Sequence, residues 1–156
     1  MADTPQTFAL QRIYLKDSSL ESPASPMVFT KAWKPKFKVD LNTRSQHIAE
    51  KSHEVVLTVT LTAELDDEKV LLIEVQQAGL FAIEGIEGDN LKQVLGIACP
   101  NLLFPYAREA VDSLALKGGF PAVGLQPVNF EALFREAQKQ AQAQAQTAPA
   151  ASDAKH

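Results

Sequence analysis

The sequence predicts one α+β domain, a four-stranded antiparallel sheet with helices packed on one of its faces. Two observations carry this prediction. In the first half of the chain, apolar and polar residues alternate with a period of two, as they do in half-buried strands. After Gly88 the apolar residues recur with helical spacing instead. Strands followed by helices are typical of the α+β class, because the helices then gather on one face of the sheet.

Four segments have the pattern of strands. Segment 8–18 alternates with one slip near Gln11 and Arg12, which predicts a β-bulge. Segments 36–41, 55–64 and 70–77 alternate more regularly. The polar stretch 65–69 has the length of a hairpin loop, whereas the two prolines in 21–26 predict a loop or an extended crossover.

The second half predicts helices. A helical pattern over 91–98 should be interrupted at Pro100, and Pro105 fits the first turn of a new helix, which Gly118-Gly119 would end. Asn129 is a plausible N-cap for a last helix. From Gln138 onward the sequence is too poor in apolar area to offset the entropy of ordering. We therefore expect a domain over residues 1–140 and an Ala/Gln-rich disordered tail over 141–156.

The composition sets bounds on partners and location. A net charge of −4 gives no support for binding nucleic acid, which usually requires a basic face. It fits basic or unfolded polypeptide partners, although a mild acidic excess is also common in soluble proteins. The N-terminus lacks the features of a signal peptide, and no apolar run approaches the roughly 20 residues that span a bilayer. We expect a cytoplasmic protein without direct membrane insertion.

A search for catalytic or metal-binding chemistry favours structural explanations. His47 and His53 lie six residues apart, a spacing that matches no known metal motif, and are expected to be surface histidines. Cys99, the only cysteine, lies among apolar residues and is expected to be a packed thiol. The segment 85–88 has two glycines but is flanked by carboxylates, so it should form a turn and not a phosphate loop. We expect no catalytic residues, no metal, no cofactor and no enzymatic activity.

Two exposed regions are candidate interaction sites. On strand 70–77, Leu72 and Glu74 should point away from the helices, and alternation alone favours a solvated face over a wet protein-binding patch. In segment 28–37, Trp33 and Phe37 could cap the edge of the core. They could equally line a groove for another chain, together with the helix that begins near Phe130. The sequence does not decide between these two interpretations. Edge strands and the outer side of the helical layer need cover, which oligomerisation would supply.

The sequence resembles the SecB family of bacterial export chaperones over about residues 8–134. The matching blocks, in chain order, are 8–14, 16–17, 28–29, 33–35, 54–57, EVQQAGLF at 74–81, CPNLLFPYARE at 99–109 and PVNFEALF at 127–134. Several long blocks in the same order make the resemblance more specific than one short motif.

The resemblance implies a homotetramer, assembled as a dimer of dimers. It also implies ATP-independent capture of unfolded precursor polypeptides and their delivery to the translocation ATPase SecA. By resemblance, the SecA-binding residues are Asp17, Glu21, Leu72 and Glu74. The unfolded-substrate groove would contain Trp33, Phe37, Phe130, Leu133 and Phe134. The residues linked to assembly are Leu71, Ile73, Val75 and Gln77.

The tail departs from the family, because it is Ala/Gln-rich where family tails are often acidic. A contact between this tail and SecA is therefore not part of the prediction. Three other functions compete with the export chaperone. The nearest is a general holdase of the same fold that serves cytosolic clients or a toxin–antitoxin pair. The other two are a small-ligand-binding or enzymatic α+β domain and a purely structural oligomer.

Overall fold

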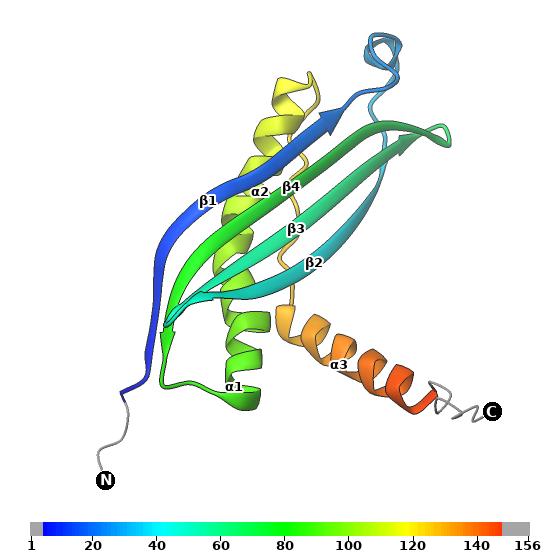
Figure 1. The fold of residues 1–156 in the computed structure, drawn as a ribbon. Coiled ribbons are helices and arrows are strands. Elements are labelled where there is room, and N and C mark those ends of the chain that lie inside the picture. Colours follow the sequence, from blue (N-terminus) through cyan, green and yellow to red (C-terminus); the bar gives the residue numbers. More distant parts are fainter. Residues whose placement is uncertain (1–4, 148–156) are drawn as a thin grey trace, which may run out of the picture.

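The computed structural model describes residues 5–147 and contains one four-stranded antiparallel sheet (Figure 1). Its strands are β1 (Thr7–Glu21), β2 (Lys36–Ala49), β3 (Ser52–Leu65) and β4 (Glu68–Glu84). They are ordered β1-β4-β3-β2, so β1 and β2 form the two edges. Each predicted strand is present and is longer than predicted. The predicted fold class is confirmed.

Strand β1 contains two irregularities. Its register against β4 shifts between Leu10 and Arg12, where the sequence predicts a bulge, and again between Leu15 and Asp17. The second shift makes Lys16 an extra residue. A bulge bends an edge strand and increases its twist, and β1 is visibly curved in Figure 1.

The helices differ from the prediction around the two prolines. Helix α1 (Gly88–Gln93) continues into a π-helical segment, η2 (Val94–Ala98), and then into α2 (Cys99–Lys117). Pro100 therefore does not interrupt the helix, because it follows a π-helical segment whose wider turn changes the hydrogen-bond pattern. Pro105 lies inside α2 and does not begin a new helix. Gly118 and Gly119 follow the end of α2, as predicted.

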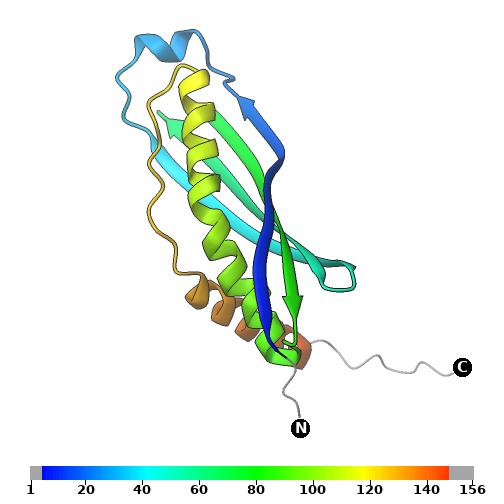
Figure 2. The same ribbon diagram turned by 90° about the vertical axis from the view of Figure 1, so that its left-hand side faces the viewer.

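Helix α2 packs against β4 and β3 and covers one face of the sheet, which we call the helix face (Figure 2). Alternate strand residues such as Leu57, Leu61 and Leu71 point into this layer and are fully buried. Burial of each such side chain stabilises the fold by about 1.5–3 kcal/mol. On the opposite, open face of the sheet, no helix of the described part of the chain packs.

The last helix, α3 (Phe130–Thr147), projects away from the sheet (Figure 1). Asn129 caps it, since the Ala132 amide donates to the Asn129 side-chain oxygen at 3.0 Å. The helix crosses the expected domain boundary at 140/141 and continues to Thr147. Alanine and glutamine are good helix formers, so a sequence without a packed face still extends the helix. The rest of the expected tail, 148–156, lies outside the described residues.

Candidate interaction surfaces

An aromatic cluster lies where the crossover between β1 and β2 meets the segment after α2. The rings of Trp33 and Phe120 have centroids 5.1 Å apart, and Phe29 lies 5.3 Å from Phe120. Phe37 at the start of β2 makes an edge contact with Trp33 at 6.4 Å. Phe120 is buried beneath these rings, whereas Phe29 and Phe37 remain about half exposed. The cluster is thus anchored in the core and presents aromatic surface to solvent.

Gly119 allows the close approach in this cluster. Its φ of +88° is unfavourable for residues with a side chain, and a Cβ there would lie 3.1 Å from the Phe29 ring. The chain turns at this residue, and Phe120 then donates its amide to the Ala115 carbonyl at 2.9 Å. This turn directs the Phe120 ring inward under Trp33.

A second apolar surface is an open cleft of about 890 Å³ between β2 and α3. Its α3 wall contains Phe130, Leu133 and Phe134, and its β2 wall contains all six consecutive residues 40–45. A strand presents alternate side chains to its two faces, so six consecutive lining residues mean that the cleft follows the strand's backbone edge. That edge has no neighbouring strand in the described sheet.

Helix α3 is held beside this cleft by an aromatic contact with η2. The Phe134 ring lies over Gly96, and a Cβ at Gly96 would be 2.6 Å from a ring carbon. Phe130 is buried and makes an edge contact with Phe104 of α2 at 5.9 Å. Leu133 is 46% exposed. The first two turns of α3 therefore combine two anchoring rings with an accessible leucine.

The predicted substrate groove is divided in the structure. Phe130, Leu133 and Phe134 line the β2–α3 cleft, whereas Trp33 and Phe37 belong to the aromatic cluster and are absent from the cleft lining. Phe120, which connects the aromatic cluster to the core, was missed by the sequence analysis. Its signal was an isolated aromatic directly after Gly118-Gly119.

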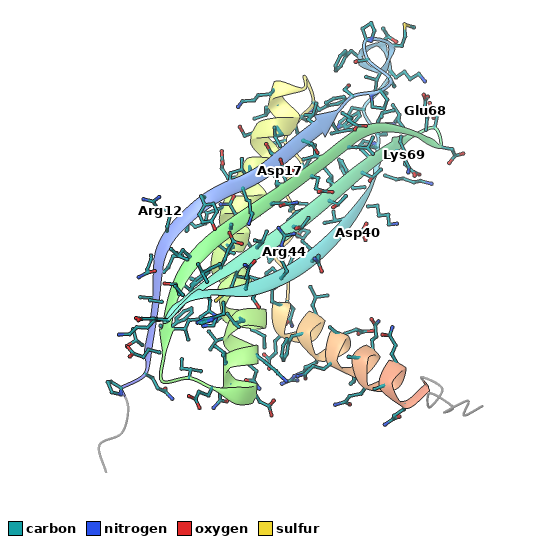
Figure 3. All side chains as sticks on the ribbon, in the orientation of Figure 1. Arg12, Asp17, Asp40, Arg44, Glu68 and Lys69 are labelled. Carbon is teal, nitrogen blue, oxygen red and sulfur yellow. The ribbon has the colours of Figure 1, made fainter. Side chains whose placement is uncertain are left out.

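The predicted acidic surface lies on the open face of the sheet. In the β1–β4 ladder Asp17 is opposite Gln76, Ser19 is opposite Glu74 and Glu21 is opposite Leu72. These pairs alternate with buried residues of β4, so Asp17, Glu21, Leu72 and Glu74 share one side. Figure 3, which views this face, shows Asp17 on β1 and Asp40 on β2. Asp40, opposite Thr60 on β3, is a further carboxylate that sequence reasoning missed.

A polar network between β1 and β3 lies further along the same face of the sheet. The Tyr14 hydroxyl donates to the Glu54 carboxylate, which also pairs with the Lys16 ammonium at 2.8 Å. The Lys16 and Tyr14 hydrogen bonds hold the pKa of Glu54 below its usual value. Burial, followed by the hydrogen bond to Glu54, raises the pKa of Tyr14 to about 12. Sequence alone gives no sign of this network, because its members come from two strands that are not neighbours.

The four residues linked to assembly lie inside the protomer. Leu71, Ile73 and Val75 are fully buried against the helical layer, as predicted for their strand face. Gln77 is 5% exposed and donates from its side-chain amide to the Tyr14 carbonyl at 3.1 Å. Because these side chains are core residues, any effect on assembly must act through the positions of α2 and β1.

The described residues offer little catalytic chemistry. Burial raises the pKa of the Cys99 thiol to about 12, which disfavours the nucleophilic thiolate. Within residues 5–147, no group of three or more His, Cys, Asp and Glu side chains converges as a metal site would. None of the helices in this part of the chain is both long and apolar enough to span a membrane.

An exposed aromatic cluster and an open apolar cleft beside an unpaired strand edge are typical of proteins that bind polypeptides. Comparison with known proteins shows the family to which the chain belongs. The family model for SecB, described as preprotein translocase subunit SecB, matches residues 1–141, and the chain belongs to this family. It is a family of protein-export chaperones, so the resemblance noted in the sequence is confirmed.

Two curated relatives agree closely in sequence. The protein-export protein SecB of Hahella chejuensis is 57% identical over 157 residues, covering 99% of this chain and 98% of the relative. That of Marinobacter nauticus is 52% identical over 138 residues, covering 88% of this chain and 84% of the relative.

A solved structure supports the fold. The Mycobacterium tuberculosis SecB-like chaperone Rv1957, in complex with a ChAD peptide from the HigA1 antitoxin, superimposes with a TM-score of 0.63. It is 18% identical, and the match covers 78% of this chain and 87% of that one. At this identity the likeness concerns the fold alone.

Proposed function

We propose that this SecB-family chaperone holds unfolded precursor polypeptides in the cytoplasm without hydrolysing ATP and delivers them to the translocation ATPase SecA. The observation that carries the proposal is the 890 Å³ cleft, which combines an apolar helix wall with the free backbone edge of β2. An unfolded chain offers the matching groups, namely apolar side chains and unpaired backbone amides and carbonyls.

Binding without a defined sequence motif follows from this chemistry. Backbone hydrogen bonds along β2 are available to any residue except proline, and contact with Leu133 is worth roughly 25 cal/mol per Å² of apolar area. The aromatic cluster around Trp33 supplies a second apolar contact at a separate place. One protomer would therefore hold a client at two weak sites.

A homotetramer, assembled as a dimer of dimers, would multiply these sites. The edge of β1 has unpaired backbone groups, and α2 exposes Leu102, Tyr106 and Leu116 on the side away from the sheet. Both features favour self-association. Several linked sites raise the effective concentration of each for a bound client, so weak contacts combine into tight holding. Leu71, Ile73, Val75 and Gln77 would support assembly indirectly, by fixing α2 and β1.

For SecA, we propose the open-face patch of Asp17, Glu21, Leu72 and Glu74. An apolar side chain surrounded by carboxylates has the composition of a hydrated protein interface that attracts a basic partner. The patch lies on the sheet face opposite α2, whereas the proposed client sites involve the sheet edge and the helices. SecA could therefore bind while a client is still held.

The proposal of separate surfaces is tested with Leu72→Arg and Glu74→Lys. Each is expected to abolish SecA binding in calorimetry while arrest of precursor refolding is unchanged. Glu87→Lys makes the same charge reversal as Glu74→Lys at an exposed position beyond β4, and this control should retain both activities. Equal loss of both activities in Leu72→Arg and Glu74→Lys would contradict separate surfaces.

The alternative is a general cytosolic holdase of the same fold that is not dedicated to export. It predicts client holding without SecA binding. A titration of the wild-type protein with SecA distinguishes the two.

A further inference from the structure

The hairpin between β2 and β3 carries two histidines that face each other. His47 and His53 are direct partners in the antiparallel ladder. Their ring centroids are 4.9 Å apart, and the ring planes are inclined by 51°. The spacing of six residues matches no metal motif in the sequence, but the hairpin brings the two rings side by side.

This separation matches that of two imidazoles bound to one metal ion. With nitrogen–metal bonds of about 2.0–2.1 Å and a roughly tetrahedral angle, the two ring centroids lie about 5 Å apart. The inclined planes also fit, because the lone pairs of two stacked parallel rings do not converge on one point. The backbone ladder fixes the spacing, so little reorganisation is needed.

The hydrogen bonding of His47 leaves a nitrogen available. Its Nε2 lies 2.8 Å from the Glu50 carbonyl, which can only accept, so Nε2 is the donor, and in the neutral ring Nδ1 then keeps its lone pair. Donation of the second ring nitrogen to a carbonyl is the usual arrangement in metal sites, where it orients the ring.

The surroundings allow a cation to approach. The neighbouring Lys51 ammonium is paired with the Glu84 carboxylate at 3.1 Å, so its charge is largely compensated. His47 is exposed and His53 is half-buried, and water can therefore complete the coordination. Cys99, the only thiol, is buried and does not compete for the metal.

We propose that His47 and His53 form a two-histidine site for a borderline divalent metal ion such as Zn²⁺, Ni²⁺ or Cu²⁺. Imidazole suits these ions, and among them Cu²⁺ should bind most tightly. A bound ion links β2 to β3 beside the register shift at His47 and Ala49, and so restrains the end of the hairpin. Neither histidine is among the residues that line the β2–α3 cleft or that form the proposed SecA patch.

The test uses the full-length protein without a histidine tag, titrated with ZnCl₂ alone by calorimetry. The variants are His47→Ala and His53→Ala, and His156→Ala is the control because it removes the third histidine of the chain. We expect one ion per chain for wild type and His156→Ala. Each hairpin variant should weaken binding by at least about tenfold, since one ring alone holds Zn²⁺ poorly.

A second measurement uses the wild-type protein and therefore does not depend on whether the variants fold. In wild-type protein, the ring resonances of His47 and His53 should shift together with the same saturation curve, and the melting temperature should rise with added Zn²⁺. Unchanged affinity in either hairpin variant, or loss of binding in His156→Ala, would overturn the proposal. A Zn²⁺ response confined to the His156 ring would do the same.

Discussion

The side-chain amide of Gln77 on β4 donates a hydrogen bond to the backbone carbonyl of Tyr14 on β1 at 3.1 Å. The bond lies beside the second bulge of β1, where Lys16 is the extra residue. A bulge interrupts the ladder and leaves backbone groups without their regular partners. The Gln77 side chain, which lies on the helix face of the sheet, thus helps to fix the course of β1 near Asp17.

Replacement of this amide should loosen β1. We expect Gln77→Leu to lower the free energy of unfolding by about 1–3 kcal/mol, because the part-buried Tyr14 carbonyl loses this donor. Urea denaturation measures the loss, and hydrogen exchange should show faster opening around residues 14–17. The neighbouring Gln76→Leu is the matched control, since Gln76 lies on the open face and its side chain accepts an exposed hydrogen bond from Arg44. Equal destabilisation by both changes would contradict this role of Gln77.

The Glu54 network predicts a pH dependence. Because the pKa of Glu54 is lower in the folded chain, its stabilising contribution is full above its unfolded value of about 4.5 and is lost as the pH falls through the folded pKa. Glu54→Gln should therefore flatten the decline of stability in acid. The exposed pair of Lys51 and Glu84 provides the control, and Glu84→Gln should change stability by less than about 1 kcal/mol. The measurement is unfolding free energy between pH 3 and pH 7, and an unchanged acid decline in Glu54→Gln would count against the network.

Tyr14 makes the stability of the fold depend on pH in the alkaline range. Its folded pKa of about 12 exceeds the unfolded value of 10.0, so its contribution is full below pH 10 and is lost as the pH rises toward 12. Tyr14→Phe should remove this alkaline loss and cost about 1.5–3 kcal/mol at neutral pH, the range for a hydrogen bond to a charged group. Tyr106→Phe removes the hydroxyl of the other tyrosine of the chain and should leave the alkaline loss in place. If the loss of stability at alkaline pH persists in Tyr14→Phe, another titrating group must cause it.

The contact between Gly96 and Phe134 should control the docking of α3. Gly96→Ala places a methyl group in the space of the ring, so we expect α3 to move outward at a cost of about 1–3 kcal/mol. Hydrogen exchange over residues 130–137 should become faster. In a Phe134→Ala background the same change should have little further effect, because the clash is gone. Additive effects of the two substitutions would show that the contact is not the cause.

The two proposed client surfaces, the aromatic cluster and the β2–α3 cleft, should be separable. Trp33 is the only tryptophan, so its fluorescence reports on the aromatic cluster. We expect a bound client to change this fluorescence, and Leu133→Ser to weaken client affinity about tenfold without changing the signal of the saturated complex. Trp33→Phe removes the signal and provides the baseline. No fluorescence response to any client would exclude the aromatic cluster from binding.

Strands β3 and β4 were predictable from sequence because each buries one face, which leaves the alternation of residues such as Val55, Leu57 and Val59. The first bulge of β1 was visible as a slip in the alternation of segment 8–18. The second was not, since Leu15 is an apolar residue in an exposed position. The helix around Pro100 was predicted wrongly, because local rules for proline do not include a π-helical turn that relieves it.

The candidate surfaces were less accessible to sequence reasoning. The strand alternation placed Leu72 and Glu74 on the open face correctly, because a period of two decides the side of a sheet. The relation of Trp33 to Phe134 depends on where α3 docks, which Gly96 fixes through a contact across 38 residues of the chain. Such long-range packing leaves no periodic signal, so the sequence names these aromatic residues as candidates but does not predict that they lie on two separate surfaces.

The measurement that tests the central claim most directly is the refolding rate of an unfolded precursor with and without this protein, in the absence of ATP. Holding by a multivalent chaperone predicts strong arrest that saturates near one tetramer per precursor. The combined variant Trp33→Ala and Leu133→Ser should relieve this arrest while remaining folded. Refolding of several precursors at an unchanged rate in the presence of the wild-type protein would contradict the account.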